Sequence, residues 1–71
     1  MKAKDFEKLE IIAEDLILAD RRNRDDNTLV HVKVYKDTKT ERAYQVDFRN
    51  KEYRESNHVL GQYSEWKKLT G

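Results

Sequence analysis

The chain has 71 residues, enough for one small domain, and 41% of them are charged, against roughly 25% in an average soluble protein. Fifteen Lys and Arg residues nearly balance fourteen Asp and Glu, so the net charge of +1 indicates no partner of opposite charge. The absence of cysteine excludes disulfides, thiolate metal sites and a cysteine nucleophile, and it favours a reducing, cytoplasmic setting.

Apolar residues occur only in short runs, and acidic residues begin at Asp5. A membrane-spanning helix needs about 20 mostly apolar residues, and a secretory signal needs an apolar stretch after its basic start. We therefore expect no membrane contact and predict a cytoplasmic protein. Proline is absent and glycine occurs only at positions 61 and 71, so the sequence has no glycine-rich phosphate loop.

Apolar residues recur at helical spacing between Lys2 and Arg22. They are Phe6, Leu9, Ile12, Ala13, Leu16 and Ile17. This spacing places them on one face of a helix. Arg21, Arg22 and Arg24 follow at the end, where the helix dipole favours cations. The pattern predicts an amphipathic helix over residues 2–22 and a polar loop over residues 23–27.

Apolar and polar residues then alternate in two segments that a polar stretch over residues 37–41 separates. The apolar members are Val30, Val32 and Val34 in the first segment and Tyr44, Val46 and Phe48 in the second. Such alternation predicts two half-buried strands. A register that pairs Val34 with Tyr44, Val32 with Val46 and Val30 with Phe48 keeps both apolar rows on one side of the sheet.

A third strand is expected after a two-residue turn at Asn50 and Lys51, because Asn tolerates the positive φ that such turns need. Folding back there pairs Tyr53 with Phe48 on the core face. On the outer face the same register pairs residues of opposite charge. Both faces agree in this register, which favours the strand.

A second helix can begin at a cap formed by Ser56 or Asn57. Its apolar face would hold Val59, Leu60, Tyr63 and Trp66. Gly61 weakens this interpretation by about 1 kcal/mol relative to Ala, and a fourth strand over residues 57–68 is the alternative. The predicted fold is one α+β domain over residues 1–71, in the order α-β-β-β-α. Its three-stranded antiparallel sheet carries both helices on one face.

His31 and His58 are the only histidines, and His31 faces Asp47 in the predicted register. An imidazole–carboxylate pair can act as a general base. However, no Ser or Thr nucleophile lies beside this pair, and an open sheet face does not exclude water. The two histidines also lack the spacing of metal ligands. We therefore expect no enzymatic activity, no catalytic residue, no metal site and no cofactor.

Cations are expected to gather at one end of the predicted domain, where both helices end and the second turn lies. We call this set the basic pole: Arg21, Arg22, Arg24, Arg49, Lys51, Lys67 and Lys68. Seven cations could contact several phosphates, with an affinity that falls steeply as salt rises. Cations also collect at helix C-termini simply to complement the dipole. The basic pole is the candidate nucleic-acid site.

Ile11 and Leu18 are expected on the side of the first helix opposite its core face. A partner helix or a second subunit could cover them, and the second predicted helix could equally bury them. The outer sheet face adds further candidate residues for a protein interface: His31, Lys33, Tyr35, Asp47 and Arg54.

These features favour a small protein-interaction module that inhibits or modulates a larger target. Phage-encoded inhibitors of host or defence machinery are an example of this class, and the association comes from size and the lack of cysteine alone. A homodimer through Ile11 and Leu18 stays open. The alternative is a nucleic-acid-binding protein that uses the basic pole.

Overall fold

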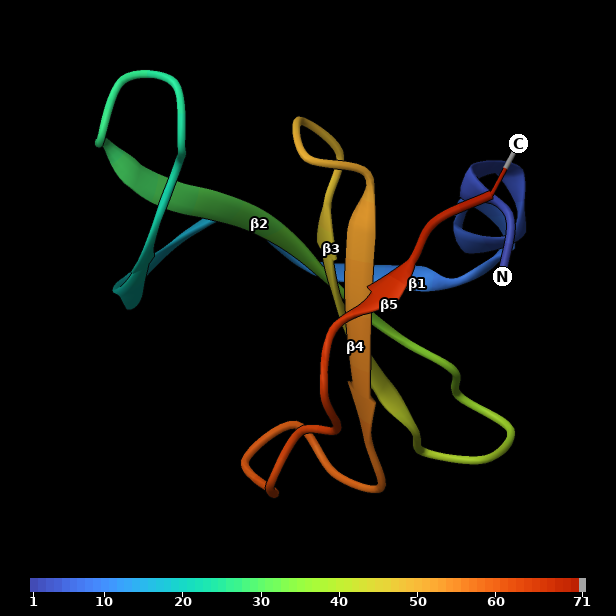
Figure 1. The fold of residues 1–71 in the computed structure, drawn as a ribbon. Helices are drawn as coiled ribbons and strands as arrows, with labels where there is room; N and C mark the ends of the chain where they lie inside the picture. Colours follow the sequence, from blue (N-terminus) through green and yellow to red (C-terminus); the bar gives the residue numbers. More distant parts are fainter. Residues whose placement is uncertain (71) are drawn as a thin grey trace.

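The computed structural model describes residues 1–70, and its regular secondary structure is mostly β-strand. A short 3-10 helix, η1 (Ala3–Lys8), is followed by five antiparallel strands (Figure 1). The strands are β1 (Glu10–Arg22), β2 (Leu29–Lys36), β3 (Ala43–Asp47), β4 (Glu52–Ser56) and β5 (Lys67–Lys68). Each strand pairs with the next one in the chain, which gives the sheet order β1-β2-β3-β4-β5. The described residues include no helix with the length and apolar character needed to cross a bilayer.

The predicted α+β fold with a three-stranded sheet is wrong, because residues 10–22 form a strand and not a helix. The error has a physical reason. Ala13 lies opposite Val34 and Leu16 lies opposite Val32, with an irregularity between them. Side chains on one face of a regular strand are two residues apart in the chain. A bulge inserts an extra residue, so two such side chains become three residues apart. A bulged strand therefore reproduces the spacing that is typical of a helix.

The second predicted helix is also absent. Residues 57–66 form turns and irregular chain, and only Lys67 and Lys68 return to the sheet as β5. Leu60, which the helix was expected to bury, is 89% exposed. The chain folds tightly at Gly61, where an added Cβ would lie 2.6 Å from the Oγ atom of Ser56. The fourth strand considered over residues 57–68 is formed only at its last two residues.

Strands over residues 29–36 and 43–47 confirm the two that alternation predicts, and a strand over residues 52–56 confirms the one expected after the turn. The predicted register between the first two is wrong by one residue, because Val34 pairs with Gln45 and Tyr35 pairs with Tyr44. A shift of one residue exchanges the faces of a strand. The valines of β2 and the apolar residues of β3 therefore lie on opposite sides of the sheet.

The sheet has a hydrophobic cluster on each side as a result. One cluster comprises Phe6, Tyr35, Tyr44, Val46, Tyr53 and Leu69. The other comprises Leu18, Val30, Val32 and Val34, with Ala13 and Trp66 packed against it. The first is centred on η1, since the ring of Phe6 lies 5.5 to 5.7 Å from three tyrosine rings. Both sides of β2 and β3 are covered, so neither strand needs to keep all its apolar residues on one side.

The turn between β3 and β4 spans residues 48–51 and not the predicted two-residue turn, and Lys51 has the positive φ of 56°. Val46 pairs with Tyr53, two residues away from the predicted register. The buried carboxylate of Asp47 accepts hydrogen bonds from the backbone N–H of Asn50 at 3.0 Å and from its Nδ2 at 2.7 Å. This longer turn leaves Phe48 outside the core, 40% exposed.

Candidate functional site

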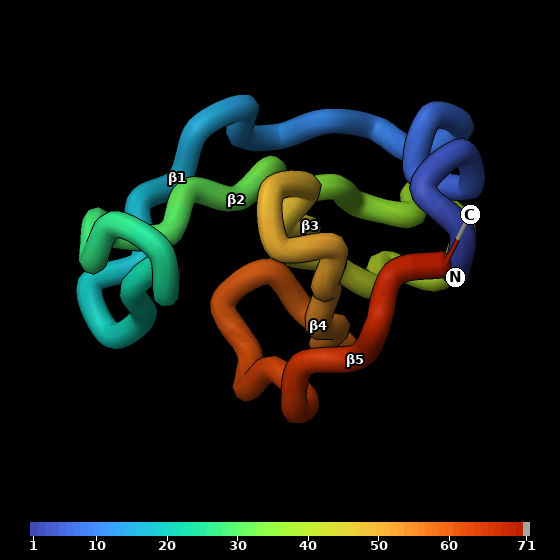
Figure 2. The backbone as a smooth tube through the Cα atoms, turned by 45° about the horizontal axis from the view of Figure 1, so that its top comes forward, coloured from blue at the N-terminus to red at the C-terminus, as the bar shows by residue number. Residues whose placement is uncertain are grey.

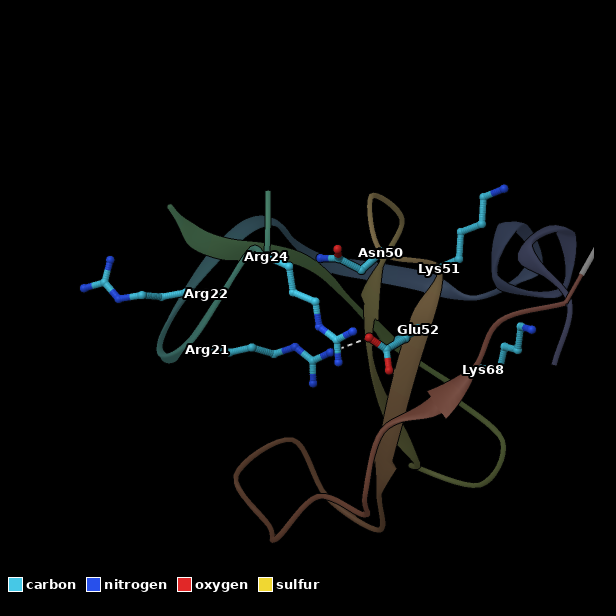
Figure 3. Close-up of a pocket in the computed structure, with 7 residues that line it drawn as sticks. All are labelled: Arg21, Arg22, Arg24, Asn50, Lys51, Glu52 and Lys68. Carbon is cyan, nitrogen blue, oxygen red and sulfur yellow. Dashed lines mark hydrogen bonds and ion pairs between the residues drawn. The ribbon is translucent and has the colours of Figure 1, made fainter. Parts of the chain in front are cut away.

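A groove of about 680 Å³ opens where the end of β1, the turn between β3 and β4, and β5 come together (Figure 3). We call it the basic groove. It is lined by Arg21, Arg22, Arg24, Asn50, Lys51, Glu52 and Lys68. Five of these seven residues are cations and one is an anion. The residues come from three separate parts of the chain, so the groove exists only in the folded protein.

Two buried asparagine contacts hold the walls of the basic groove together. Asn23 is 4% exposed, and its Nδ2 lies 3.1 Å from the hydroxyl of Thr28 and 3.3 Å from the carbonyl oxygen of Thr28. Its Oδ1 accepts a hydrogen bond of 2.8 Å from the Nδ2 of Asn50 in the turn between β3 and β4. The loop after β1 is thereby joined to that turn. Asn27, at φ 59°, lets this loop reverse direction.

Arg21 forms an ion pair with Glu52, the only carboxylate in the lining. Arg22 donates to the carbonyl oxygen of Asn27 at 2.9 Å. Figure 3 shows the side chains of Arg21 and Arg24 converging near Glu52, whereas that of Arg22 points away from them. The negative charge of Glu52 is therefore already neutralised by Arg21, within the groove itself.

Four cations of the basic groove have no acidic partner among residues 1–70. They are Arg22, Arg24, Lys51 and Lys68, and all four are exposed. The side chains of Lys51 and Lys68 extend on the side of the groove opposite to Arg22 (Figure 3). Positive charge is therefore left unneutralised across the width of the groove.

Two other members of the basic pole are neutralised by neighbouring acids. Arg49 lies 2.8 Å from both Asp25 and Asp26. Hydrogen bonds from the hydroxyl of Thr28 and from Arg49 hold the pKa of Asp26 well below its ordinary value of 3.8. Lys67 lies 2.8 Å from Glu55, and this hydrogen bond lowers the pKa of the Glu55 carboxyl.

The structure thus places five of the seven basic-pole residues around one groove and sets Arg49 and Lys67 apart from it. The fold that brings them together differs from the predicted one. Arg21, Arg22 and Arg24 end a strand and begin a loop, and they do not complete a helix. Their common location comes from the order of turns along the chain, which is similar in the two folds. Their binding of nucleic acid stays a prediction.

Trp66, the only tryptophan of the chain, lies beside the basic groove and is in contact with two guanidinium groups. The Cζ of Arg21 is 4.3 Å from the centre of the indole ring, and that of Arg54 is 4.7 Å from it. Arg54 is further held by a hydrogen bond of 2.7 Å from its Nε to Oε1 of Gln45. The alternation pattern could not reveal this cluster, because Trp66 belongs to the irregular segment before β5.

The residues predicted for a protein interface do not form one surface. Leu18 is 7% exposed and packs with Val30, so the proposed pair of Ile11 and Leu18 is not exposed as a unit. Tyr35 and Asp47 are buried as well. The remaining candidates are occupied separately: His31 bonds to Asp15 at 2.6 Å, Lys33 lies over the ring of Phe48, and Arg54 lies over Trp66.

The largest exposed apolar surface lies instead on β1. Ile11, Ile12, Leu16 and Ile17 are between 38% and 52% exposed. The sequence interpretation assigned three of these to a buried helix face, and only Ile11 to the outside. An uninterrupted pair of apolar residues at 11–12 and again at 16–17 indicates apolar side chains on both faces of a strand. That was the available signal.

Residues 1–70 contain no group of three His, Cys, Asp or Glu side chains that could hold a metal ion. The predicted pair of His31 with Asp47 is wrong, because His31 contacts Asp15 of β1 on an exposed surface. Comparison of the chain with protein-family models, curated proteins and solved structures gives no match. The function is therefore argued from the geometry.

Proposed function

We propose that this protein is a cytoplasmic, non-enzymatic binding protein that binds nucleic acid through the basic groove. One observation carries the proposal. Five cations from three parts of the chain line a single groove, and its only carboxylate is already paired with Arg21. A groove with unneutralised cations along its walls is suited to the phosphates of a nucleic-acid backbone.

The identity of the cations supports phosphate as the ligand. The guanidinium of Arg24 can donate two parallel hydrogen bonds to one phosphate, whereas Lys51 and Lys68 act as compact point charges. The hydrogen bonds between Asn23 and Asn50 already join the loop and turn that carry Arg24 and Lys51. Less conformational entropy is then lost when a ligand binds, because these segments are ordered beforehand.

The groove offers no evident means of reading base sequence. Its lining contains one amide side chain, Asn50, and the Nδ2 of that amide is engaged by Asn23 and Asp47. The indole of Trp66 is in contact with Arg21 and Arg54. Contacts to phosphate position a protein without specifying sequence. The expected binding is therefore independent of sequence and sensitive to salt.

Fluorescence anisotropy with a labelled duplex oligonucleotide of mixed sequence tests this function. The double variant Arg24→Glu/Lys51→Glu should lose binding, because it reverses two unpaired cations of the groove. A matched control, Lys4→Glu/Lys39→Glu, makes the same change of net charge at two exposed lysines outside the groove and should bind nearly as the wild type does. Equal affinity of the two double variants would refute the proposal.

A second candidate function is the protein-interaction module that inhibits or modulates a larger target. The four exposed aliphatic residues of β1 support it, since exposed apolar surface concentrated on one element marks interaction sites on small soluble proteins. Affinity capture from a nuclease-treated lysate should then recover one protein with the wild type and with Leu60→Lys, and lose it with Leu16→Lys/Ile17→Lys. Recovery of the same protein by all three baits would contradict this function.

A further inference from the structure

The edge strand β1 carries four of the seven large apolar residues that are exposed among residues 1–70. β1 is 13 residues long and pairs only with β2, so its other edge has no strand beside it within residues 1–70. Figure 2 shows β1 along the top of the molecule with no chain beyond it. The exposed side chains of Ile11, Ile12, Leu16 and Ile17 all lie along this edge strand.

The opposite edge of the sheet is different. β5 has two residues, Lys67 and Lys68, and both are exposed. Short edge strands and edge lysines prevent a sheet from pairing with another chain. A long edge strand that carries several aliphatic residues has no such protection. The β5 edge of the sheet is therefore protected from pairing with another chain, whereas the β1 edge is free to pair.

The two ends of β1 carry charges of opposite sign that are unpaired within residues 1–70. Glu10 and Glu14 lie in the first half and have no ion-pair partner among the described residues. Arg22 ends the strand, and its side chain points away from those of Arg21 and Arg24 (Figure 3). Glu10 and Arg22 are the two end residues of β1 and are equally far from Leu16 along the strand.

We propose that two copies of this chain associate through β1, antiparallel to each other, about a twofold axis close to Leu16. The axis brings Glu10 of each copy opposite Arg22 of the other, so that unpaired charges meet charges of opposite sign. The exposed aliphatic side chains between them are then removed from water. The β1 strand of a second copy is the partner that fits, because it offers the opposite charge at each end and apolar side chains between the ends.

The shape of β1 limits the contact to a short central ladder. Leu16, Ile17 and Leu18 pair regularly with β2, and the pairing is irregular on both sides of them. Backbone hydrogen bonds between copies are therefore confined to the neighbourhood of the axis, and side chains supply the rest of the contact. A twofold contact uses the same surface on both copies and closes at two. Because β5 is guarded by its lysines, the assembly stops at a dimer.

Sedimentation velocity over a concentration series tests the dimer. The wild-type chain, of 8.6 kDa, should approach twice that mass as concentration rises. Ile17→Lys places a charge at the most exposed aliphatic residue of β1 and should remain monomeric. Leu60→Lys, the same kind of change at a residue of the loop before β5, should dimerise as the wild type does. A monomeric wild type throughout the series, or a dimeric Ile17→Lys, would overturn the proposal.

Charge exchange tests the antiparallel arrangement separately. Glu10→Arg and Arg22→Glu should each raise the dissociation constant of the dimer by about tenfold, because two symmetry-related pairs are lost and like charges meet. The combined variant Glu10→Arg/Arg22→Glu should restore the wild-type constant. Failure of the combined variant to recover would overturn the arrangement.

Both substituted side chains are exposed, so the charge exchange does not depend on a core residue. Circular dichroism of each variant checks that the sheet is retained. If Ile17→Lys loses its folded spectrum, Arg22→Glu alone and the combined variant carry the test. Anisotropy with the duplex oligonucleotide is read on Ile17→Lys and Leu60→Lys, because these two variants leave all five cations of the basic groove unchanged.

Discussion

Phe6 offers the sharpest test of the two-sided sheet. It is fully buried, and its ring lies 5.5, 5.5 and 5.7 Å from those of Tyr35, Tyr44 and Tyr53. Two of these contacts are edge-on and one is tilted, which are favourable arrangements for aromatic pairs. The short helix η1 is thus attached to three strands through one side chain.

Replacing a buried Phe by Ala costs about 3–5 kcal/mol, through lost transfer free energy and the cavity left behind. A domain of this length has a free energy of unfolding of roughly 4–10 kcal/mol, at the usual contribution per residue. Phe6→Ala should therefore remove about a third of the stability or more. Phe6→Leu fills most of the cavity but loses the aromatic contacts, so its cost should be smaller, about 1–2 kcal/mol.

Urea denaturation followed by circular dichroism measures these costs as shifts of the unfolding midpoint. The matched control is Phe48→Ala, at the only other phenylalanine of the chain. Phe48 is 40% exposed, and the Nζ of Lys33 lies 5.7 Å from the centre of its ring, so the loss of the ring should cost under about 1 kcal/mol. Similar costs for Phe6→Ala and Phe48→Ala would refute the placement of the two rings.

Three further predictions concern the basic groove and its surroundings. Asn23→Ala should cost about 1–3 kcal/mol in urea denaturation, because the hydrogen bonds of this buried amide to Thr28 and Asn50 are lost; a cost within error of zero would contradict the asparagine contacts. The pKa of Asp26 is lowered in the folded state, so its stabilisation is present above the ordinary pKa of 3.8 and is lost as pH falls below it; acid titration of Arg49→Gln should show a weaker loss than the wild type. Oligonucleotide binding should change the fluorescence of Trp66, because Arg21 contacts both the groove and the indole; unchanged emission at saturation would argue against binding there.

Local alternation of residues was sufficient to predict β2 and β3, because successive side chains of a strand point to opposite faces. β4 was predicted from the turn before it and from the pairing across that turn. β1 was misassigned because its bulges change the spacing between Ala13 and Leu16 from two to three. Apolar residues that recur every three or four positions normally indicate a helix. Nothing within residues 10–22 distinguishes a helix from a bulged strand as the origin of this spacing. The open edge of β1 could not be predicted once the segment was assigned to a helix.

The face that each strand presents is decided by partners distant in the chain. Phe6 covers one side of the sheet, and Leu18 with Trp66 covers the other. Because both sides of the sheet are covered, Val34 and Tyr44 can lie on opposite faces and both be buried. The observed register therefore buries apolar residues as well as the predicted register, which places both residues on one face. Sequence reasoning assumed a single core, and the assumption led to the register error.

The amino-acid sequence alone determined where cations concentrate along the chain: at the end of the first long segment, at the turn near residue 50 and near the C-terminus. Only the tertiary structure decided which of them share a surface. The contact between Asn23 and Asn50 brings two loops together, while nearby acids neutralise Arg49 and Lys67. Charge is a property of each residue, but a groove depends on distances between segments, and those distances follow from the register of the strands and the covering of both faces.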